Sequence, residues 1–414
     1  IRKIRRAMPL TVRFKADGYS KLFSAGKGVN LNRRGTSLLN MDLGYLDSKT
    51  DPTDNLENYK RLTASLRYTL KADRKAYSWS WNSALDYQGS FDNAKADPDL
   101  NYGHIDEYRS SYNRIAMTNN FMLKPRNSVW SEVAVNSMVS LQTDRLRQTR
   151  LVAPQRYGIV PLSWTDGENE AQAVFAEYVA HYLCDGKPFS AYVKAKGVMG
   201  FKTGRATHTL KLGLNWDIAK NFGRGQVYDM HRPLSVTGWS SRPRRYKDIP
   251  SLQNLSAFGE EQMRWSLGRS TIDLMAGLRL AMMPGLDSRY DMSGRIYADP
   301  RINMGWHLPK LTVGGEPMAI SLNPTKMPPL NYLYPDRYYS NFISLAYYAA
   351  SSPAQNSCFV VHTYIQDPTN YHLSPARNHK WEVRVDLDWH DNTLSIDYFR
   401  ETMNDGFRYA AVYG

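Results

Sequence analysis

The stretch from Tyr77 to Tyr87 reads Tyr-Ser-Trp-Ser-Trp-Asn-Ser-Ala-Leu-Asp-Tyr. Its odd positions carry large side chains, with Ser83 as the exception, and its even positions carry small or polar ones. Because successive side chains of a strand point to opposite faces, the stretch predicts one strand with an aromatic face and a polar face. Strands of soluble proteins average about 5 or 6 residues, whereas a tilted membrane-crossing strand needs about 9 to 11. The length of this alternation therefore predicts a transmembrane strand with aromatic rings at both membrane surfaces.

Composition agrees with a barrel and disfavours other classes. The apolar runs are too short for a membrane helix, which needs about 20 apolar residues, but a barrel needs apolar side chains only at alternate positions. Tyrosine is abundant, with 28 residues, as interfacial girdles require. The net charge of +14 comes from basic residues scattered among strand-like segments, and no nucleic-acid-binding motif accompanies them. We therefore expect no nucleic-acid partner.

Similar alternating segments recur along the chain, separated by short and long connections in turn. The short turns are predicted at residues 71–76, 124–127, 202–206, 266–270, 309–317 and 390–392, and the longest loops at 88–110, 142–188, 218–250 and 323–379. The predicted strands cover residues 10–15, 39–45, 62–70, 77–87, 115–123, 129–141, 189–201, 210–216, 252–265, 272–280, 302–306, 318–322, 381–389 and 394–398. This pattern predicts an all-β fold, a transmembrane antiparallel up-and-down β-barrel with about 14 strands, long extracellular loops and short periplasmic turns.

Two segments are harder to interpret. Residues 20–34 are rich in Gly and Lys and have no assignment. Residues 171–184 look ordered and are followed by a turn-like Asp185-Gly186-Lys187-Pro188. If 171–184 crossed the membrane, every later short turn would change sides, so we interpret 142–188 as one large excursion with local structure of its own.

Several segments between residues 271 and 408 resemble, in the right order, the barrel of TonB-dependent outer-membrane transporters. They are Ala276-Gly277-Leu278-Arg279, Asp299-Pro300-Arg301-Ile302-Asn303, Leu330-Asn331-Tyr332-Leu333-Tyr334-Pro335, Leu373-Ser374-Pro375, Trp381-Glu382-Val383 and Asp397-Tyr398-Phe399. The segment from His208 to Gly213 and Tyr228-Asp229 resemble the preceding strand and its loop. Leu280-Ala281, Ala376 and Arg384 depart from the family pattern, which blurs the subfamily.

The resemblance implies a barrel of about 22 strands in the bacterial outer membrane. It implies active import of a nutrient, driven by TonB through an N-terminal plug, and a starch-utilisation-type or related receptor. On this interpretation residues 1–414 are a partial barrel, and the plug and the C-terminal strands are not present. Expected partners are outer-membrane lipid and lipopolysaccharide, TonB through the plug, and a surface lipoprotein lid. The alternatives are a passive porin, a barrel-type adhesin and a soluble surface protein.

The segment from Trp239 to Lys247 is the candidate binding site. Arg242, Arg244 and Arg245 lie beside Trp239 and Tyr246 in one predicted outer loop. Guanidinium groups bind phosphate and carboxylate bidentately, and aromatic rings stack on sugars or flat ligands. The functional hypothesis is capture of an anionic substrate or of lipopolysaccharide phosphate, and the alternative is a solvated loop with local ion pairs. Tyr332, Tyr334, Tyr338, Tyr339, Tyr347 and Tyr348 crowd the longest loop, where they either contact a ligand or pack the loop on itself.

The remaining sequence motifs do not predict a catalytic site or a bound cofactor. The segment from Asp97 to Gly103, with Glu107, has near-calcium-loop spacing but misplaced Gly and Glu, so we expect a polar loop and no metal. No nucleophile elbow, zinc-helix motif or phosphate-binding Gly loop occurs. Cys184 and Cys358 are the two cysteines, which allow one disulfide, although free thiols are the preferred interpretation. The chain is therefore not expected to be an enzyme.

Overall fold

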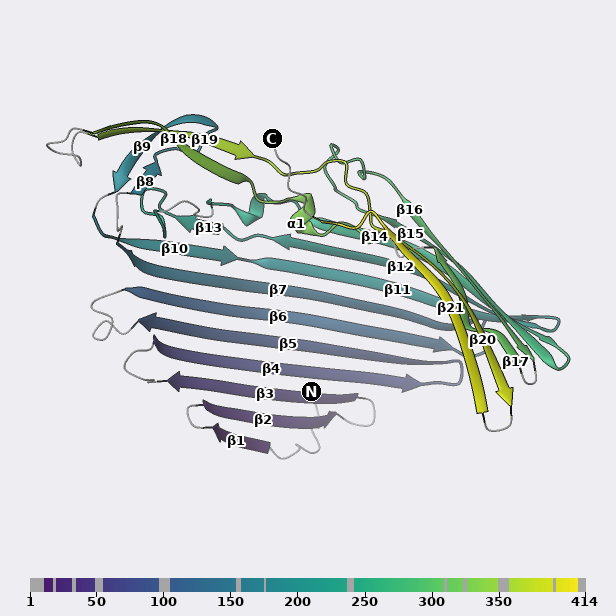
Figure 1. The fold of residues 1–414 in the computed structure, drawn as a ribbon. Coiled ribbons are helices and arrows are strands. Elements are labelled where there is room, and N and C mark those ends of the chain that lie inside the picture. The colour runs from purple at the N-terminus through teal and green to yellow at the C-terminus, as the bar shows by residue number, and fades with distance from the viewer. Residues whose placement is uncertain are drawn as a thin grey trace.

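A computed structural model of the chain describes residues 11–17, 20–31, 35–48, 55–96, 105–153, 158–174, 176–236, 242–308, 311–322, 326–348, 357–389 and 392–408. Most of them form one antiparallel sheet of 17 strands, the main sheet. A second sheet of four strands, the loop sheet, is built from residues between the strands of the main sheet. Figure 1 shows the main sheet as a curved wall that runs from purple β1 to yellow β21.

Neighbours in sequence are neighbours in the main sheet, as expected for an up-and-down barrel wall. Hydrogen-bonded pairing passes from each long strand to the next one along the chain, and every pair is antiparallel. The strands are β1 (Thr11–Asp17), β2 (Ser20–Leu31), β3 (Gly35–Ser48), β4 (Asn55–Asp73), β5 (Tyr77–Ala96), β6 (Asp106–Pro125), β7 (Trp130–Val152), β10 (Tyr178–Gly186), β11 (Pro188–Thr203), β12 (Ala206–Asn221), β13 (Gly225–Tyr228), β14 (Leu252–Leu267), β15 (Ser270–Met282), β16 (Tyr297–Leu308), β17 (Leu311–Leu322), β20 (Arg377–Trp389) and β21 (Asn392–Asn404).

One face of β4 to β7 is apolar, and its described side chains are exposed. Leu66, Leu85, Met117 and Val139 are direct partners across β4 to β7 and are 44%, 45%, 44% and 46% exposed. The alternate positions of the same strands face the other way and carry polar side chains such as Asn82 and Asn120, which are also partners. A row of aliphatic side chains open to the surroundings is what a lipid-facing surface requires.

Aromatic rings gather on the apolar face near the short turns. Trp79 stacks on Phe121 with ring centroids 6.3 Å apart, and Tyr68 meets Trp81 edge-on at 6.0 Å. Trp265 and Trp306 are exposed beside the short turns of later strands. The aromatic side chains at the start of β5 are thus followed by others on later strands at the same end of the sheet. This is the arrangement of one aromatic girdle in an outer-membrane barrel.

The strands extend beyond the alternating stretches. Residues 88–110 and 142–170 were predicted as loops, but β5 continues to Ala96, β6 begins at Asp106 and β7 continues to Val152. The prediction was wrong there because alternation ends where both faces meet water, whereas backbone pairing needs no apolar face. Residues 20–31 of the unassigned stretch form strand β2, and residues 311–317 of the predicted turn belong to strand β17.

The predicted turn at Asp185-Gly186-Lys187-Pro188 is also wrong. Strand β10 pairs with the distal half of β7 and β11 pairs with its proximal half, so that Gly186 faces Asp144 and Phe189 faces Leu141 in one unbroken register. Only Lys187 interrupts the two strands, and its N–H donates to Asn221 Oδ1 over 2.8 Å. Residues 178–203 therefore follow one straight path, and the chain reaches the next short turn on the expected side.

The loop sheet joins two long loops. It contains β8 (Gly158–Pro161) and β9 (Gly167–Val174) from one loop and β18 (Tyr338–Tyr348) and β19 (Ser357–Gln366) from the other, in the order β18-β19-β9-β8. Strands β9 and β19 pair from Gly167 to Ala171 and from Phe359 to Thr363. Figure 1 shows this sheet at the end of the main sheet where the long connections lie. Local structure in the first loop was predicted, whereas its pairing with residues 357–366 was not.

A small apolar core anchors the last long loop. Met283, Tyr290 and Met292, between β15 and β16, pack with Leu333 of the short helix α1 (Leu330–Leu333). Tyr290 Oη donates a hydrogen bond to the carbonyl of Leu333. Within the described ranges no helix is long and apolar enough to cross a membrane.

Candidate arginine cavity

A cavity of about 600 Å³ opens at the loop end of the main sheet. Four guanidinium groups share its lining, together with tyrosines and two aspartates, and we call it the arginine cavity. The arginines are Arg242, Arg244, Arg289 and Arg337. They come from three separate segments of the chain, the one before the 3-10 helix η2 (Tyr246–Asp248), the β15–β16 loop and the start of β18.

Only some of the predicted site residues line this cavity. Arg242 and Arg244 line it, whereas Arg245 is exposed and lies outside the lining. Tyr246 turns toward β10, where its Oη lies 3.4 Å from the free thiol of Cys184. Trp239 lies outside the described residues. The free thiol agrees with the preferred interpretation of the cysteines.

Glycine at position 225 allows the arginine segment to approach β13. The N–H of Gln226 donates to the carbonyl of Arg244 over 3.0 Å. Gly225 has φ +74°, and a Cβ there would lie 1.8 Å from the oxygen of Arg244. Only glycine fits both the left-handed backbone and the close contact.

Arg242 is held by aromatic groups. Its Cζ lies 3.0 Å from the ring centroid of Trp164 and 4.8 Å from that of Tyr339, and its guanidinium is hydrogen-bonded to the Tyr228 hydroxyl. Burial lowers the pKa of Arg242 and raises the pKa of Tyr228. Within the described part of the chain its buried Nε has no hydrogen-bond partner. A half-buried guanidinium with an unused donor is suited to donate a hydrogen bond to an anionic ligand.

Arg244 is bound to the last long loop. It forms an ion pair with Asp336, and its Nη2 donates to the carbonyl of Tyr334 over 2.8 Å. These contacts tie the segment before η2 to the residues after α1. They orient the guanidinium toward the cavity that both segments line.

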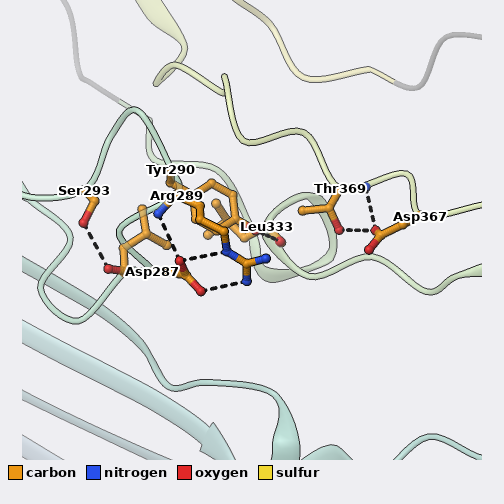
Figure 2. Close-up of polar contacts among 8 residues, drawn as sticks. Asp287, Arg289, Tyr290, Ser293, Leu333, Asp367 and Thr369 are labelled. Atoms are coloured by element: carbon orange, nitrogen blue, oxygen red, sulfur yellow. Dashed lines mark hydrogen bonds and ion pairs between the residues drawn. The ribbon is translucent and has the colours of Figure 1, made fainter.

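Arg289 forms a two-pronged ion pair within its own loop. Its Nε and Nη2 lie 3.1 Å and 2.8 Å from the two carboxylate oxygens of Asp287, as Figure 2 shows. These hydrogen bonds lower the pKa of Asp287 to about 2. The guanidinium also lies over the ring of Tyr371, 4.8 Å from its centroid. Because the pair is exposed, it contributes little stability and leaves the cation accessible.

Arg337 forms an ion pair with Asp367 in the lining of the cavity. Its Nε lies 3.7 Å from Asp367 Oδ2. Thr369 donates to Asp367 Oδ1 from its N–H over 3.0 Å and from its hydroxyl over 2.5 Å, as Figure 2 shows. The hydroxyl donor is the main reason that the pKa of Asp367 is lowered. The carboxylate is therefore ionised and partly balances the four cations.

The tyrosine cluster is only partly assembled at the cavity. Tyr334, Tyr338 and Tyr339 line it, together with Tyr371. Tyr332 packs on Phe407 with ring centroids 5.5 Å apart, and the side chains of Tyr347 and Tyr348 lie outside the described residues. Four residues at or beside the cavity were not predicted from the sequence, namely Arg289, Arg337, Tyr371 and Trp164. Arg337 could have been found because it follows the tyrosine-rich Leu330–Pro335 motif, whereas Trp164 and Arg289 carry no local signal.

The calcium-like loop is described only in part. Residues 97–104 of the calcium-like loop lie outside the described residues, and Glu107 accepts a hydrogen bond from Arg109 Nε over 2.7 Å. Among the described residues no group of three or more His, Cys, Asp or Glu side chains could hold a metal ion. Glu260 and Glu261 face opposite ways, toward Lys211 and His208 respectively.

Comparison with known proteins gives matches in structure but not in sequence. No protein-family profile matches the chain, and no curated protein matches it. Among solved structures, the RagAB peptide importer in its closed-closed state matches with a TM-score of 0.51 and 10% identity, covering 93% of this chain and 44% of that one.

Two siderophore receptors also match. The ferric enterobactin receptor PfeA of Pseudomonas aeruginosa, as its Q482A mutant with enterobactin, has a TM-score of 0.44 and 14% identity, covering 95% of this chain and 53% of that one. The siderophore receptor PirA of Acinetobacter baumannii has a TM-score of 0.42 and 14% identity, covering 96% and 52%. The chain spans about half the length of these structures. At such identities the likeness concerns the fold, and the chain has the β-barrel fold of TonB-dependent outer-membrane receptors.

Proposed function

We propose that this chain belongs to a bacterial outer-membrane barrel that imports a nutrient with energy supplied through TonB. In this proposal the apolar face of the main sheet contacts lipid, and the arginine cavity captures a cargo that carries a carboxylate or phosphate group. The observation that carries the proposal is the convergence of Arg242, Arg244, Arg289 and Arg337 on one cavity at the loop end of a barrel wall.

The lining suits a particular kind of cargo. Guanidinium groups bind carboxylates and phosphates through paired hydrogen bonds, and aromatic rings stack on flat or sugar-like groups. Asp336 and Asp367 share the lining, so the cavity is not a purely cationic surface. This balance favours a cargo with one or two anionic groups and a ring over a long polyanion.

The binding half of the proposal is tested with purified protein. Exposure to a fractionated nutrient extract, followed by mass spectrometry of the retained molecules, identifies the cargo. Arg244→Ala combined with Arg337→Ala should reduce its retention at least about tenfold, because two charge-assisted contacts are lost. Arg245→Ala is the matched control, since Arg245 belongs to the same segment but lies outside the cavity lining. Equal retention by the double variant would reject the cavity as the site.

The transport half is tested in cells. TonB acts through a plug domain in this proposal, so uptake of the identified cargo should stop when TonB is deleted or the proton gradient is collapsed, while binding persists. A passive porin would continue to transport, and an adhesin would bind without any uptake. Continued uptake would therefore favour a passive porin over active import, and binding without uptake would favour an adhesin.

A surface lipoprotein lid is part of the proposal. Strand β18 forms an edge of the loop sheet, and its Phe342 is well exposed beside Tyr364 of β19, while Ile343 is exposed on the opposite face. Exposed apolar groups on a sheet edge are typical of a partner-binding surface. A photo-crosslinking residue at position 342 should capture a lipid-modified protein in cells, whereas one at position 77, near the short turns, should not. Capture at neither position would remove the lid.

A further inference from the structure

We propose that the polar face of β12, β14, β15 and β16 carries a second binding site, for an uncharged sugar. The site is a cavity of about 620 Å³, which we call the inner cavity. It lies near the short turns, at the opposite end of the main sheet from the arginine cavity. Its role as a second station for the cargo rests on the proposed function, whereas its binding chemistry follows from its own residues.

The inner cavity is built on two neighbouring rows of side chains, each of which crosses four paired strands. The first row contains Thr209, Gln262, Met275 and Asn303, and the second contains Thr207, Arg264, Asp273 and Gly305. The second row lies one residue from the row of Trp265, Ile272 and Trp306, which occupies the apolar face. Thr207 and Gly305 stand at the two ends of the second row, and their small size leaves room for the cavity.

Asn303 is the poorly satisfied group of the first row. Its Nδ2 lies 3.8 Å from Met275 Sδ, a weak acceptor that it shares with Gln262 Nε2 at 3.6 Å. Among the described residues the buried Oδ1 of Asn303 has no hydrogen-bond donor. The terminal torsion of asparagine is soft, so the amide can turn toward a ligand at small cost. A ligand hydroxyl, which both donates and accepts, would satisfy this amide better than the sulfur does.

The second row presents an oriented ion pair. Arg264 donates from Nε and Nη2 to the two carboxylate oxygens of Asp273 over 2.7 Å and 2.8 Å, and His307 Nε2 lies 3.1 Å from Asp273 Oδ2. The side chain of Arg264 is 68% exposed, and these bonds leave its Nη1 for a ligand. The carboxylate oxygens keep further acceptor capacity. Because Arg264 and Asp273 cancel each other's charge, the row suits hydroxyl groups better than an ionised group.

The two cavities differ in charge but not in size. The arginine cavity has four arginines and two aspartates, whereas the inner cavity has one arginine and one aspartate beside hydroxyl and amide groups. Their volumes are about 600 Å³ and 620 Å³, so a molecule of the same size can occupy either. A cargo that carries an anionic group and a sugar ring is thus held firmly at the loop end and more loosely near the short turns. This order of affinities favours passage toward the short turns.

The experiment measures binding of a panel of neutral monosaccharides and disaccharides to the purified protein in detergent, by ligand-observed NMR titration. At least one sugar should bind the wild-type protein. Thr209→Val combined with Asn303→Leu should weaken that binding about tenfold, because two hydrogen-bonding groups are lost. The control is Glu132→Gln combined with Lys196→Gln, which removes a 2.9 Å ion pair from the polar face outside both cavities and should leave sugar binding unchanged.

A gain of binding guards against a folding defect. Met275→Leu conserves the volume of the side chain but removes the weak acceptor that Asn303 Nδ2 faces without a ligand. The amide then gains more from a ligand hydroxyl, so the sugar should bind about two to three times more tightly. A variant that was only misfolded would bind less.

The outcomes separate this site from the proposed function. Absence of binding by every sugar of the panel, or equal affinity in Thr209→Val combined with Asn303→Leu, would overturn the site. Sugar binding that is lost in Arg244→Ala combined with Arg337→Ala would place the ligand in the arginine cavity and overturn the inner cavity. Tighter binding of glucuronate than of glucose would overturn the preference for an uncharged ligand. Failure of the proposed function appears instead in cargo retention and in TonB-dependent uptake, which these sugar titrations do not measure.

Discussion

Asn169 of β9 donates its side-chain amide to Thr363 Oγ1 of β19 over 3.0 Å, and both residues are almost completely buried. Thr363 passes the hydrogen bond on to Asn341 Oδ1 of β18 over 2.9 Å. One polar chain thus crosses three strands of the loop sheet and joins two loops that are distant in sequence. Because a buried polar group without a partner is costly, this chain fixes the two loops in one arrangement.

Removing the central hydroxyl should loosen the loop sheet. Thr363→Val keeps the shape of the side chain but leaves Asn169 and Asn341 without their shared partner, which should cost about 1 to 3 kcal/mol locally. Hydrogen exchange of residues 158–174 and 357–366 should accelerate together, while β4 to β7 stay protected. Thr363→Ser keeps the hydroxyl and should behave nearly as the wild type. Independent exchange of the two loops in Thr363→Val would contradict this coupling.

A charge on the apolar face should destabilise the barrel wall. Leu66→Arg places a guanidinium among Leu85 and its partners, and at mid-membrane this should cost about 2 to 4 kcal/mol. The measurement is urea unfolding of the protein folded into lipid vesicles. Asn82→Arg introduces the same group on the polar face of β5 and should cost much less. Similar stability of the two variants would show that the faces do not differ in environment.

Substitution of two glycines, compared with each other, distinguishes the effect of backbone strain from the effect of a close contact. Gly225 and Gly268 both have positive φ, +74° and +64°, but an added Cβ meets Arg244 at the first and nothing within 4 Å at the second. Both Ala variants should lose about 1 to 2 kcal/mol from left-handed strain. Only Gly225→Ala should also displace the arginine segment and weaken cargo retention. Thermal unfolding and retention measured on both proteins distinguish the two effects.

The core under the last loop should open at alkaline pH. Burial raises the pKa of Tyr290 from 10.0 to about 12, so the folded protein favours the neutral phenol. The stability that Tyr290 contributes is therefore complete below pH 10 and is lost as the pH rises through about 12. Tyr290→Phe should remove one late tyrosinate step from the absorbance titration near 295 nm. The variant should also lose about 1 to 3 kcal/mol at neutral pH, because the Leu333 carbonyl loses its donor. An unchanged titration would refute the raised pKa.

The membrane-facing strands could be predicted from the sequence alone. Because one face of each strand meets lipid and the other meets a polar interior, apolar and polar side chains alternate along it. Tyr77 to Tyr87 and Leu62 to Leu70 alternate clearly, and both lie inside strands of the structure. The ends of the strands could not be predicted, since Gln88 to Lys95 pair with β6 although Phe91 is their single large apolar side chain. Backbone hydrogen bonding between strands does not by itself require a recognisable pattern of side chains.

The arginine cavity was predictable only in part for a related reason. Arg242 and Arg244 stand out because basic and aromatic residues are adjacent in sequence. Arg289 and Trp164 reach the same region through tertiary contacts between loops, and single-sequence patterns do not encode such contacts.

The uninterrupted register of β10 and β11 along β7 makes the junction at Lys187 intolerant of length changes. Deleting that one residue would slide β10 by a single step against its template, and a single step reverses which side every side chain occupies. Asp185 would then turn inward and leave Arg145 behind, while Tyr182 and Cys184 would turn outward. A connection that resembles a dispensable turn in the sequence is thus a spacer whose length decides which side chains of β10 face outward.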